Sequence, residues 1–136
     1  MQKPIASLMA VGLLLLAACG TGGEVEPGPI TSFDDIAGTT YERQQGSPDF
    51  IHFFEDGTMH SSLIRTAVVD NPFSINEARF EGTTVFLKEI RGPCHLNPDS
   101  IYEIHLLENG NLRFVVVEDP CANRSSFFLA EFVAVP

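Results

Sequence analysis

Two histidines flank a turn signal and could together bind a metal ion. His52 and His60 lie on either side of Glu55-Asp56-Gly57. If the glycine closes a type I turn with a bulge, the two histidines face each other across a hairpin, whereas a two-residue turn would place Phe53 opposite His60. A zinc or copper ion needs further ligands, and the sequence offers no third one. We therefore expect ordinary surface histidines, with no metal and no cofactor.

The residue types used in covalent and acid–base catalysis occur without the motifs that activate them. Neither Ser61-Ser62 nor Ser125-Ser126 belongs to a Gly-x-Ser-x-Gly nucleophile elbow. The adjacent acids Asp34-Asp35 and Glu55-Asp56 have simpler roles at a helix start and in a turn. Gly22-Gly23 lies in a polar linker and does not form a phosphate-binding loop. The sequence therefore indicates no enzyme.

The N-terminus has the pattern of an export signal. Met1-Gln2-Lys3 is a positively charged start, and Ile5 to Ala18 is an apolar run too short to span a bilayer comfortably. The run ends in Leu16-Ala17-Ala18-Cys19, which resembles the lipobox of bacterial lipoproteins. That resemblance implies that residues 1–18 are a signal peptide and that Cys19 receives a diacylglyceryl group and becomes the first mature residue. The alternatives are an ordinary signal peptide with an incidental cysteine and a retained membrane helix.

Residues 19–31 are expected to be a flexible tether between this anchor and the folded domain. Gly20 to Pro29 is rich in glycine, proline and glutamate, which cannot bury enough apolar surface to fold. Acyl chains on Cys19 would hold the protein on a membrane. In the resemblance, Asp after the cysteine would signal inner-membrane retention, and Gly20 stands there instead. We therefore expect an extracytoplasmic protein of the cell envelope, on the outer membrane if the organism has one.

The other two cysteines, Cys94 and Cys121, are expected to form a disulfide. An exported destination is oxidising, and an even number of cysteines remains after the lipobox is set aside. Closing the loop between them would stabilise the fold by roughly 3.5 kcal/mol in the chain-entropy model. Metal ligation is the rival interpretation, but no Cys-x-x-Cys is present and His95 has no second ligand at the usual spacing.

The charge balance excludes one class of partner. The chain has 8 Lys and Arg against 18 Asp and Glu, for a formal net charge of −10. Nucleic-acid binding needs clustered basic side chains that displace counterions, and anionic lipid headgroups are disfavoured for the same reason. The acidic residues are scattered along the chain, which is typical of a solvated surface. We expect no nucleic-acid partner.

From Ser32 onward the sequence predicts one short helical turn followed by an all-β domain, residues 32–136. Ser32 is a helix N-cap with acids in the first turn, and Gly38 ends the turn. Turn signals then separate short apolar segments, and no amphipathic helical period follows. The fold class is a small antiparallel up-and-down β-barrel, with a β-sandwich as the alternative. The candidate strands are 40–44, 50–54, 58–64, 66–69, 78–80, 83–90, 101–107, 112–117 and 126–135.

Side-chain alternation indicates which of these strands are half exposed. In Ile101 to Leu106 the residues Tyr102, Ile104 and Leu106 share one face, and Glu103 and His105 lie on the other. Leu112 to Val117 is instead apolar on both faces in places, which would be hazardous on an open edge. Covering by the terminal strand, as in a closed barrel, would meet that requirement.

The domain resembles the calycin plan of lipocalins and fatty-acid-binding proteins. The likeness lies in the helical turn, the first strand after Gly38-Thr39-Thr40, the train of hairpins and the late Arg124. The stretch Glu118 to Arg124 also resembles the ending of small bacterial lipoproteins with lipocalin-like domains. In lipocalins a Gly-x-Trp begins the first strand, and a late Arg covers that Trp at the closed end. Here threonine replaces the Trp.

The resemblance implies a small hydrophobic ligand inside the barrel. Two roles for Arg124 stay open, a structural cap or surface ion pair and a ligand anchor. A barrel of this size either fills its interior with side chains or holds one small ligand. The alternative function is therefore an envelope protein-interaction or inhibitor module with a filled barrel and no ligand pocket.

Overall fold

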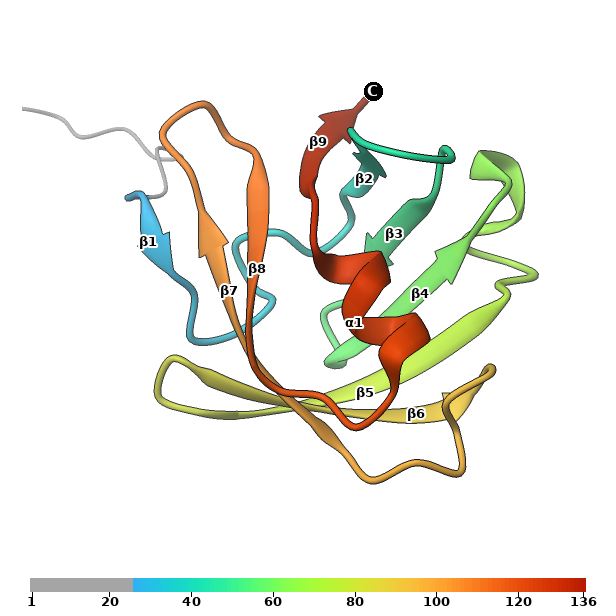
Figure 1. Ribbon diagram of the computed structural model, residues 1–136. Coiled ribbons are helices and arrows are strands. Elements are labelled where there is room, and N and C mark those ends of the chain that lie inside the picture. The colour runs from blue at the N-terminus through green and yellow to red at the C-terminus, as the bar shows by residue number, and fades with distance from the viewer. Residues whose placement is uncertain (1–25) are drawn as a thin grey trace, which may run out of the picture.

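The computed structural model describes residues 26–136, which form a single antiparallel sheet with one short α-helix (Figure 1). The predicted signal peptide, the lipobox and Cys19 lie outside the described residues. The strands are β1 Gly28–Pro29, β2 Thr40–Arg43, β3 Phe50–Phe53, β4 Thr58–Ser62, β5 Ser74–Glu81, β6 Thr84–Arg91, β7 Ser100–Leu106, β8 Leu112–Glu118 and β9 Glu131–Val135. A 3-10 helix, η1 Arg65–Ala67, follows β4, and α1 Ala122–Phe128 precedes β9.

The sheet closes on itself as a barrel. Its order is β1-β7-β6-β5-β4-β3-β2-β9-β8, and an additional pairing of β7 with β8 joins the two ends. Eight strands, β2 to β9, form the closed barrel, and β1 is the extra strand beside β7. The all-β up-and-down barrel is therefore confirmed, and the β-sandwich alternative is wrong.

The folded domain begins earlier in the chain than predicted. Gly28 and Pro29 pair with Leu106 and His105 of β7, and the Ile30 amide donates to the Ile104 carbonyl at 2.9 Å. The Ile30 side chain is buried in the core. The last residues of the segment predicted to be tether thus belong to the folded domain, because β6 pairs with only the first half of β7 and leaves the second half free for β1.

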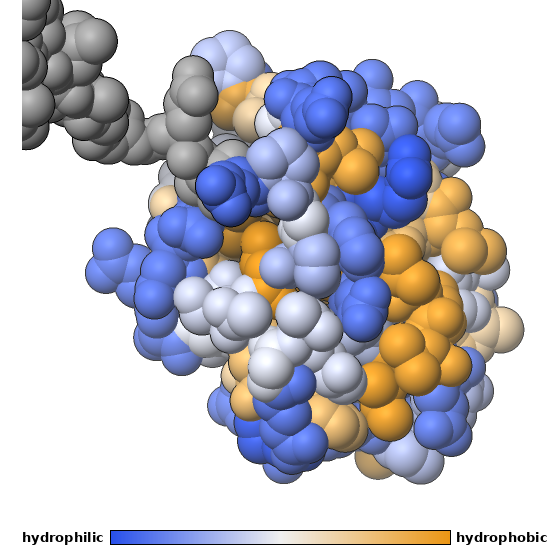
Figure 2. All heavy atoms as spheres, turned by 90° about the vertical axis from the view of Figure 1, so that its left-hand side faces the viewer, coloured by the Kyte–Doolittle hydropathy of each residue, from blue (hydrophilic) through white to orange (hydrophobic). Residues whose placement is uncertain are grey.

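The side of the barrel where β1 and β7 lie is mostly hydrophilic, and apolar side chains gather toward one margin of it (Figure 2). Val115 and Val117 of β8 are 40% and 61% exposed. The terminal strand covers β8 over Leu112 and Arg113 alone. The barrel closure expected for this strand is present, but it does not bury the outer valines.

The hairpin between β3 and β4 has the register in which the two histidines face each other. His52 pairs with His60 and Phe53 with Met59. Gly57 adopts a φ of +87°, which an L side chain rarely adopts, and the Asp56 Oδ1 accepts from the Thr58 amide at 2.9 Å. These local constraints select the longer of the two turns considered for this hairpin.

Two predicted strands are wrong. The segment predicted as a strand over 126–135 begins inside α1, and only β9 is extended. An apolar run of this length is compatible with helix or strand, and contacts with the barrel decide for helix up to Phe128, which packs on Tyr102 and Phe114. The segment 66–69 contains η1 and a turn, in which Val68 is buried away from any strand partner.

One end of the barrel interior is filled by side chains. Phe33 and Ile36, from the predicted helical turn, are buried in the core. The turn is a single one, in which the Ala37 amide donates to the Phe33 carbonyl at 2.7 Å. The Phe33 ring meets those of Phe53 and Phe80 edge to face, with centroids 4.9 Å and 5.3 Å away. The helical turn therefore closes this end of the barrel.

We predict that Phe53→Ala lowers the free energy of unfolding by about 3–5 kcal/mol, because it leaves a cavity in a fully buried aromatic cluster. Its neighbour Phe54 is partly exposed on the outer face, so Phe54→Ala is the matched control and should cost much less. Urea denaturation of both variants measures the difference. Equal losses would contradict the assignment of inner and outer faces.

Candidate functional site

Neighbouring strands change from apolar to polar side chains along their inner faces, all toward the same end of the barrel. The polar residues are Asp49 just before β3, Ser61 of β4, Ser74 and Asn76 of β5, and Glu89 of β6. We call these five the polar layer. All are buried. Ser61 pairs with Ser74 and Asn76 with Glu89, so the register of the sheet brings these side chains together.

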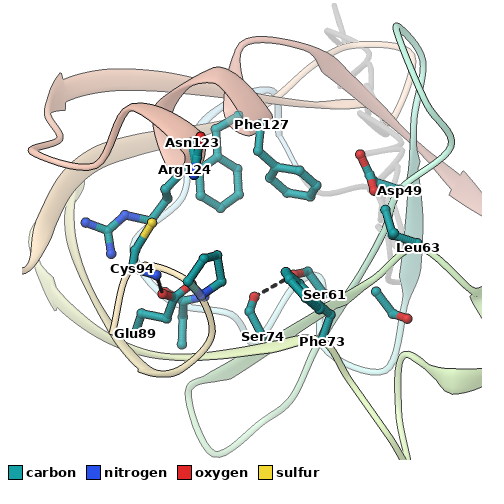
Figure 3. Close-up of a pocket in the computed structure, with 14 residues that line it drawn as sticks. Asp49, Ser61, Leu63, Phe73, Ser74, Glu89, Cys94, Asn123, Arg124 and Phe127 are labelled. Atoms are coloured by element: carbon teal, nitrogen blue, oxygen red, sulfur yellow. Dashed lines mark hydrogen bonds between the residues drawn. The ribbon is translucent and has the colours of Figure 1, made fainter. Parts of the chain in front are cut away.

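A pocket of about 370 Å³ lies against the polar layer (Figure 3). Phe127 and Phe128 of α1 contribute one apolar wall, and Leu63 and Phe73 from the two ends of the β4–β5 connection contribute another. This volume is within the range of small-molecule sites, about 300–1,000 Å³. The pocket combines apolar walls with a buried polar layer, which is the usual composition of a site for a small organic molecule.

The hydrogen bonds of the polar layer are incomplete among the described residues. The Ser61 and Ser74 hydroxyls bond to each other at 2.6 Å, and the Glu89 Oε2 accepts from the Cys94 amide. The Asn76 Oδ1 is buried and accepts no hydrogen bond from any described residue. A buried acceptor without a donor costs about 1–3 kcal/mol, so the site favours a molecule that brings donors.

Burial makes the two carboxyls of the polar layer harder to ionise. It raises the pKa of Glu89, although the Cys94 amide and the positive charge of Arg124 act in the opposite direction. It also raises the pKa of Asp49 against the attraction of Arg43, whose Nη1 lies 3.5 Å from the Asp49 Oδ2. A cation or a strong donor placed in the pocket would stabilise the charged forms of these groups.

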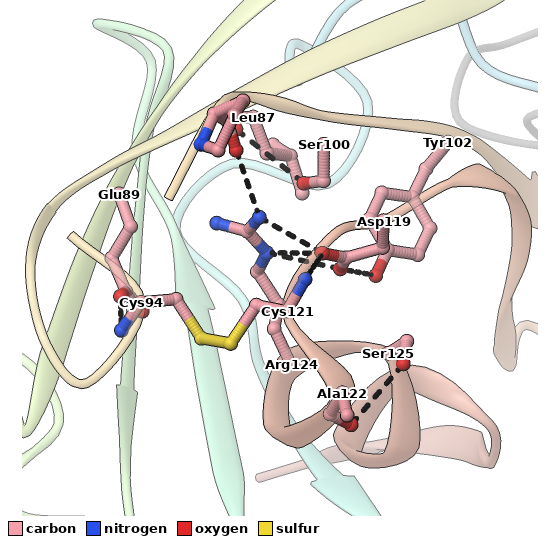
Figure 4. A network of polar contacts seen from close by, with 11 residues as sticks. Leu87, Glu89, Cys94, Ser100, Tyr102, Asp119, Cys121, Ala122, Arg124 and Ser125 are labelled. Atoms are coloured by element: carbon pink, nitrogen blue, oxygen red, sulfur yellow. Dashed lines mark hydrogen bonds and ion pairs between the residues drawn. A yellow bond between two sulfur atoms is a disulfide. The ribbon is translucent and has the colours of Figure 1, made fainter. Parts of the chain in front are cut away.

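A buried ion pair holds α1 beside the pocket (Figure 4). The Arg124 guanidinium donates through Nε and Nη2 to the Asp119 carboxylate at 2.9–3.1 Å, and through Nη2 to the Pro98 carbonyl at 3.2 Å. The Tyr102 hydroxyl donates to the same carboxylate. The Arg124 and Asp119 side chains are 4% and 0% exposed. The Arg124 Nη1 is buried without a partner among the described residues.

These contacts shift the pKa values of the network in opposite directions. Burial opposes ionisation of Asp119, but hydrogen bonds from Arg124, Tyr102 and the Cys121 amide outweigh it and lower the pKa of that carboxyl. Burial, helped by the adjacent carboxylate, strongly raises the pKa of Tyr102. Asp119 is therefore a carboxylate, and Tyr102 a neutral donor, throughout the physiological pH range.

The predicted disulfide is present. Cys94, in the loop after β6, bonds to Cys121, the N-cap residue of α1, with their Cα atoms 6.1 Å apart. Cys94 also lines the pocket. The disulfide and the Arg124–Asp119 pair together hold the N-terminal part of α1 to the barrel.

Arg124 is the candidate ligand residue that the sequence singles out, and it lines the pocket. The position implied by the lipocalin resemblance, over the start of the first strand at the closed end, is wrong for this chain. The closed end contains Phe33 and Gly38, whose amide bonds to the Phe53 carbonyl, whereas Arg124 lies at the opposite end. Arg124 instead forms the buried ion pair with Asp119 described above, rather than a surface one.

The paired histidines lie on the outer face of the barrel, away from the pocket. The His52 Nδ1 is 2.7 Å from the Thr40 hydroxyl, and the His60 Nδ1 is 3.2 Å from the Val68 carbonyl oxygen. The Phe54 ring contacts both imidazoles, at centroid distances of 4.7 Å and 4.4 Å. Within residues 26–136, no group of three or more metal-ligating side chains is found.

The polar layer was missed by sequence reasoning because it forms no motif. Its members come from separate strands and are joined only by sheet register. The one available signal was in β5, where Ser74, Asn76, Ala78 and Phe80 alternate with Ile75, Glu77 and Arg79. Period-2 alternation identifies a face, but in this strand each face contains both polar and apolar residues, so the inner one could not be chosen.

Comparison of the chain with protein-family models, curated proteins and solved structures finds no match. The closed antiparallel barrel is consistent with a lipocalin-like fold. Among the described residues, no helix is both long enough and apolar enough to cross a membrane.

We predict that Asp119→Asn lowers the free energy of unfolding at pH 7 by about 3–5 kcal/mol, because it leaves the Arg124 charge buried and unpaired. The control is Glu81→Gln, which breaks the exposed pair with Arg79 and should change stability by less than about 1 kcal/mol. Denaturant unfolding of the three proteins provides the measurement.

We predict that the stability difference between wild type and Asp119→Asn depends on pH. The folded pKa of Asp119 lies below its unfolded value, so its stabilising effect is complete above about pH 4 and is lost as the pH falls through the folded pKa. The stability difference between wild type and Asp119→Asn should therefore shrink in acid. A stability difference that stays constant from pH 7 to pH 2 would contradict a stabilising, ionised Asp119.

Proposed function

We propose that the protein is a lipid-anchored, extracytoplasmic lipoprotein of the cell envelope whose lipocalin-like barrel binds a small hydrophobic molecule. The observation that carries the ligand proposal is the pocket of about 370 Å³ between α1 and the polar layer. The anchor proposal rests on the lipobox-like Leu16-Ala17-Ala18-Cys19.

The shape of the barrel interior limits the size of the ligand. Tyr102, Phe53 and Phe132 are fully buried in the core, so a ligand does not run the whole length of the barrel. It would sit at the end that contains α1, with its apolar part against Phe127 and Phe73. This arrangement favours a short molecule with one polar group over a long acyl chain.

One feature supports export, and the length of the tether limits how far an anchored domain could lie from a membrane. The Cys94–Cys121 disulfide forms in oxidising compartments. The chain from Cys19 to Gly28, where the barrel begins, can extend at most about 30 Å. An anchor on Cys19 would thus keep the pocket close to a membrane, which is a source of hydrophobic molecules.

A second candidate is a protein-interaction module, and one observation favours it. Leu63, Ile64 and Phe73 of the β4–β5 connection are 61–62% exposed and lie at or beside the pocket. Exposed apolar groups that cluster in this way are typical of interaction sites. The version of this function that requires a filled barrel without a pocket is not supported.

We predict that the full-length protein, extracted in mild detergent, carries a noncovalent small molecule that native mass spectrometry detects. Phe127→Glu should abolish the added mass, because it places a charge in the apolar wall. Phe86 of β6 does not line the pocket, so Phe86→Glu is the matched control and should keep the ligand. A wild-type protein without any added mass would favour the interaction module.

We predict that Cys19→Ala moves the protein from the membrane fraction to the soluble fraction, since the thiol that carries the acyl chains is lost. Thr21→Ala alters the same segment without touching the thiol and should leave the protein on the membrane. Fractionation followed by immunoblotting measures both. Retention of the Cys19→Ala protein on the membrane would show that Cys19 is not the anchor.

A further inference from the structure

We infer that the pocket selects molecules with a cationic primary amine head and a short apolar body, the amine lying between Asn76 and Glu89. This inference rests on the proposed ligand-binding function and specifies the chemical class of the ligand. It depends on the direct juxtaposition of a carboxylate and an unpartnered amide oxygen on the inner face of the barrel.

Asn76 and Glu89 are direct cross-strand partners in β5 and β6. Side chains opposite each other on one face of an antiparallel pair have Cβ atoms about 4.5–5.5 Å apart, so one small group can contact both. The two residues are 2% and 7% exposed. An irregularity in the β5–β6 register lies beside Asn76, and such bulges commonly redirect a side chain next to a site.

The acceptors of these two residues are not used up by the protein. The Asn76 Oδ1 has no donor among the described residues. The Glu89 carboxylate receives a single hydrogen bond from them, the one from the Cys94 amide to Oε2. An ammonium group has three N–H donors and no acceptor. It can donate to Oδ1 of Asn76 and to the carboxylate of Glu89 at once, with a third donor left for the serine pair.

The charges around the pocket also favour a cation. Arg124 lines the pocket, but its charge is balanced by the bidentate contact with Asp119. Asp49 is likewise paired with Arg43. Glu89 has no ion-pair partner within 4 Å among the described residues, and the Arg124 guanidinium acts on it from a greater distance. The unbalanced charge in the pocket is therefore negative.

The unpartnered Arg124 Nη1 is a feature that would favour an anion. A single neutral or negative acceptor could satisfy it. An anionic head would, however, lie in the same small pocket as the unbalanced Glu89 carboxylate, and like charges at such distances repel. The unbalanced negative charge of Glu89 therefore makes the amine the better match.

The test uses three probes of equal chain length, octylammonium, octanol and octanoate, titrated into the folded protein by calorimetry at pH 7 and 150 mM salt. We expect octylammonium to bind at least tenfold more tightly than octanol, and octanoate to bind most weakly. In Glu89→Gln, octylammonium and octanol should bind within about threefold of each other. Asn76→Leu should weaken octylammonium binding at least fivefold. Glu77→Gln, on the exposed outer face beside Asn76, should change nothing.

The outcomes separate this inference from the proposed function. Equal binding of all three probes would retain the pocket and overturn the amine preference, and preferred binding of octanoate would overturn it in favour of Arg124. A preference for octylammonium that persists in Glu89→Gln would reflect general attraction to an anionic protein and would also overturn it. Absence of binding by every probe would instead contradict the proposed function. If Glu89→Gln does not fold, the wild-type ratio and Asn76→Leu decide.

Discussion

The buried Arg124–Asp119 pair is the interaction on which the architecture of the pocket depends. The closing strands β8 and β9 pair at only two positions, Leu112 with Phe132 and Arg113 with Glu131. Beyond them the barrel wall is interrupted, and α1 fills the gap with Phe128 stacked on Phe114 at 4.3 Å between centroids. A helix of seven residues is too short to be stable alone. Its position therefore depends on the ion pair, the Tyr102 hydroxyl and the disulfide at its N-cap.

This dependence explains why the two ends of the barrel differ. At one end Phe33, Ile36 and Phe53 pack as part of the hydrophobic core, which favours stability. At the other end the Arg124–Asp119 ion pair, the disulfide and α1 replace continuous strand pairing. The inner faces there carry Asn76 and Glu89 in place of apolar side chains. A separate closing element leaves space between itself and the sheet, and that space is the pocket.

Much of the fold was predictable from the sequence, because hairpins are local. Turn residues such as Gly57 and the alternation of Tyr102, Ile104 and Leu106 predicted strand positions and their inner faces. The segment Leu112 to Val117, apolar on both faces in places, indicated closure. The oxidising compartment implied by the export signal indicated the Cys94–Cys121 disulfide. The helix α1 was not predictable, since an apolar run such as Phe127-Phe128-Leu129 suits a strand equally well and only its contacts with Tyr102 and Phe114 decide. The polar layer depends on register between four strands, which no single segment encodes.

The polar layer is an unfavourable feature for a barrel that needs only to be stable. Apolar residues at Asn76 and Glu89 would continue the core that includes Met59 of β4 and Leu87 of β6. They would also remove a buried acceptor that lacks a donor. Their burial also leaves the Glu89 carboxyl with a raised pKa. Groups of this kind become favourable when a bound molecule supplies the missing donors, because the same low dielectric that penalises an empty acceptor strengthens a completed hydrogen bond. The incomplete hydrogen bonding is thus the physical reason to regard this end of the barrel as a binding site and the filled end as its support.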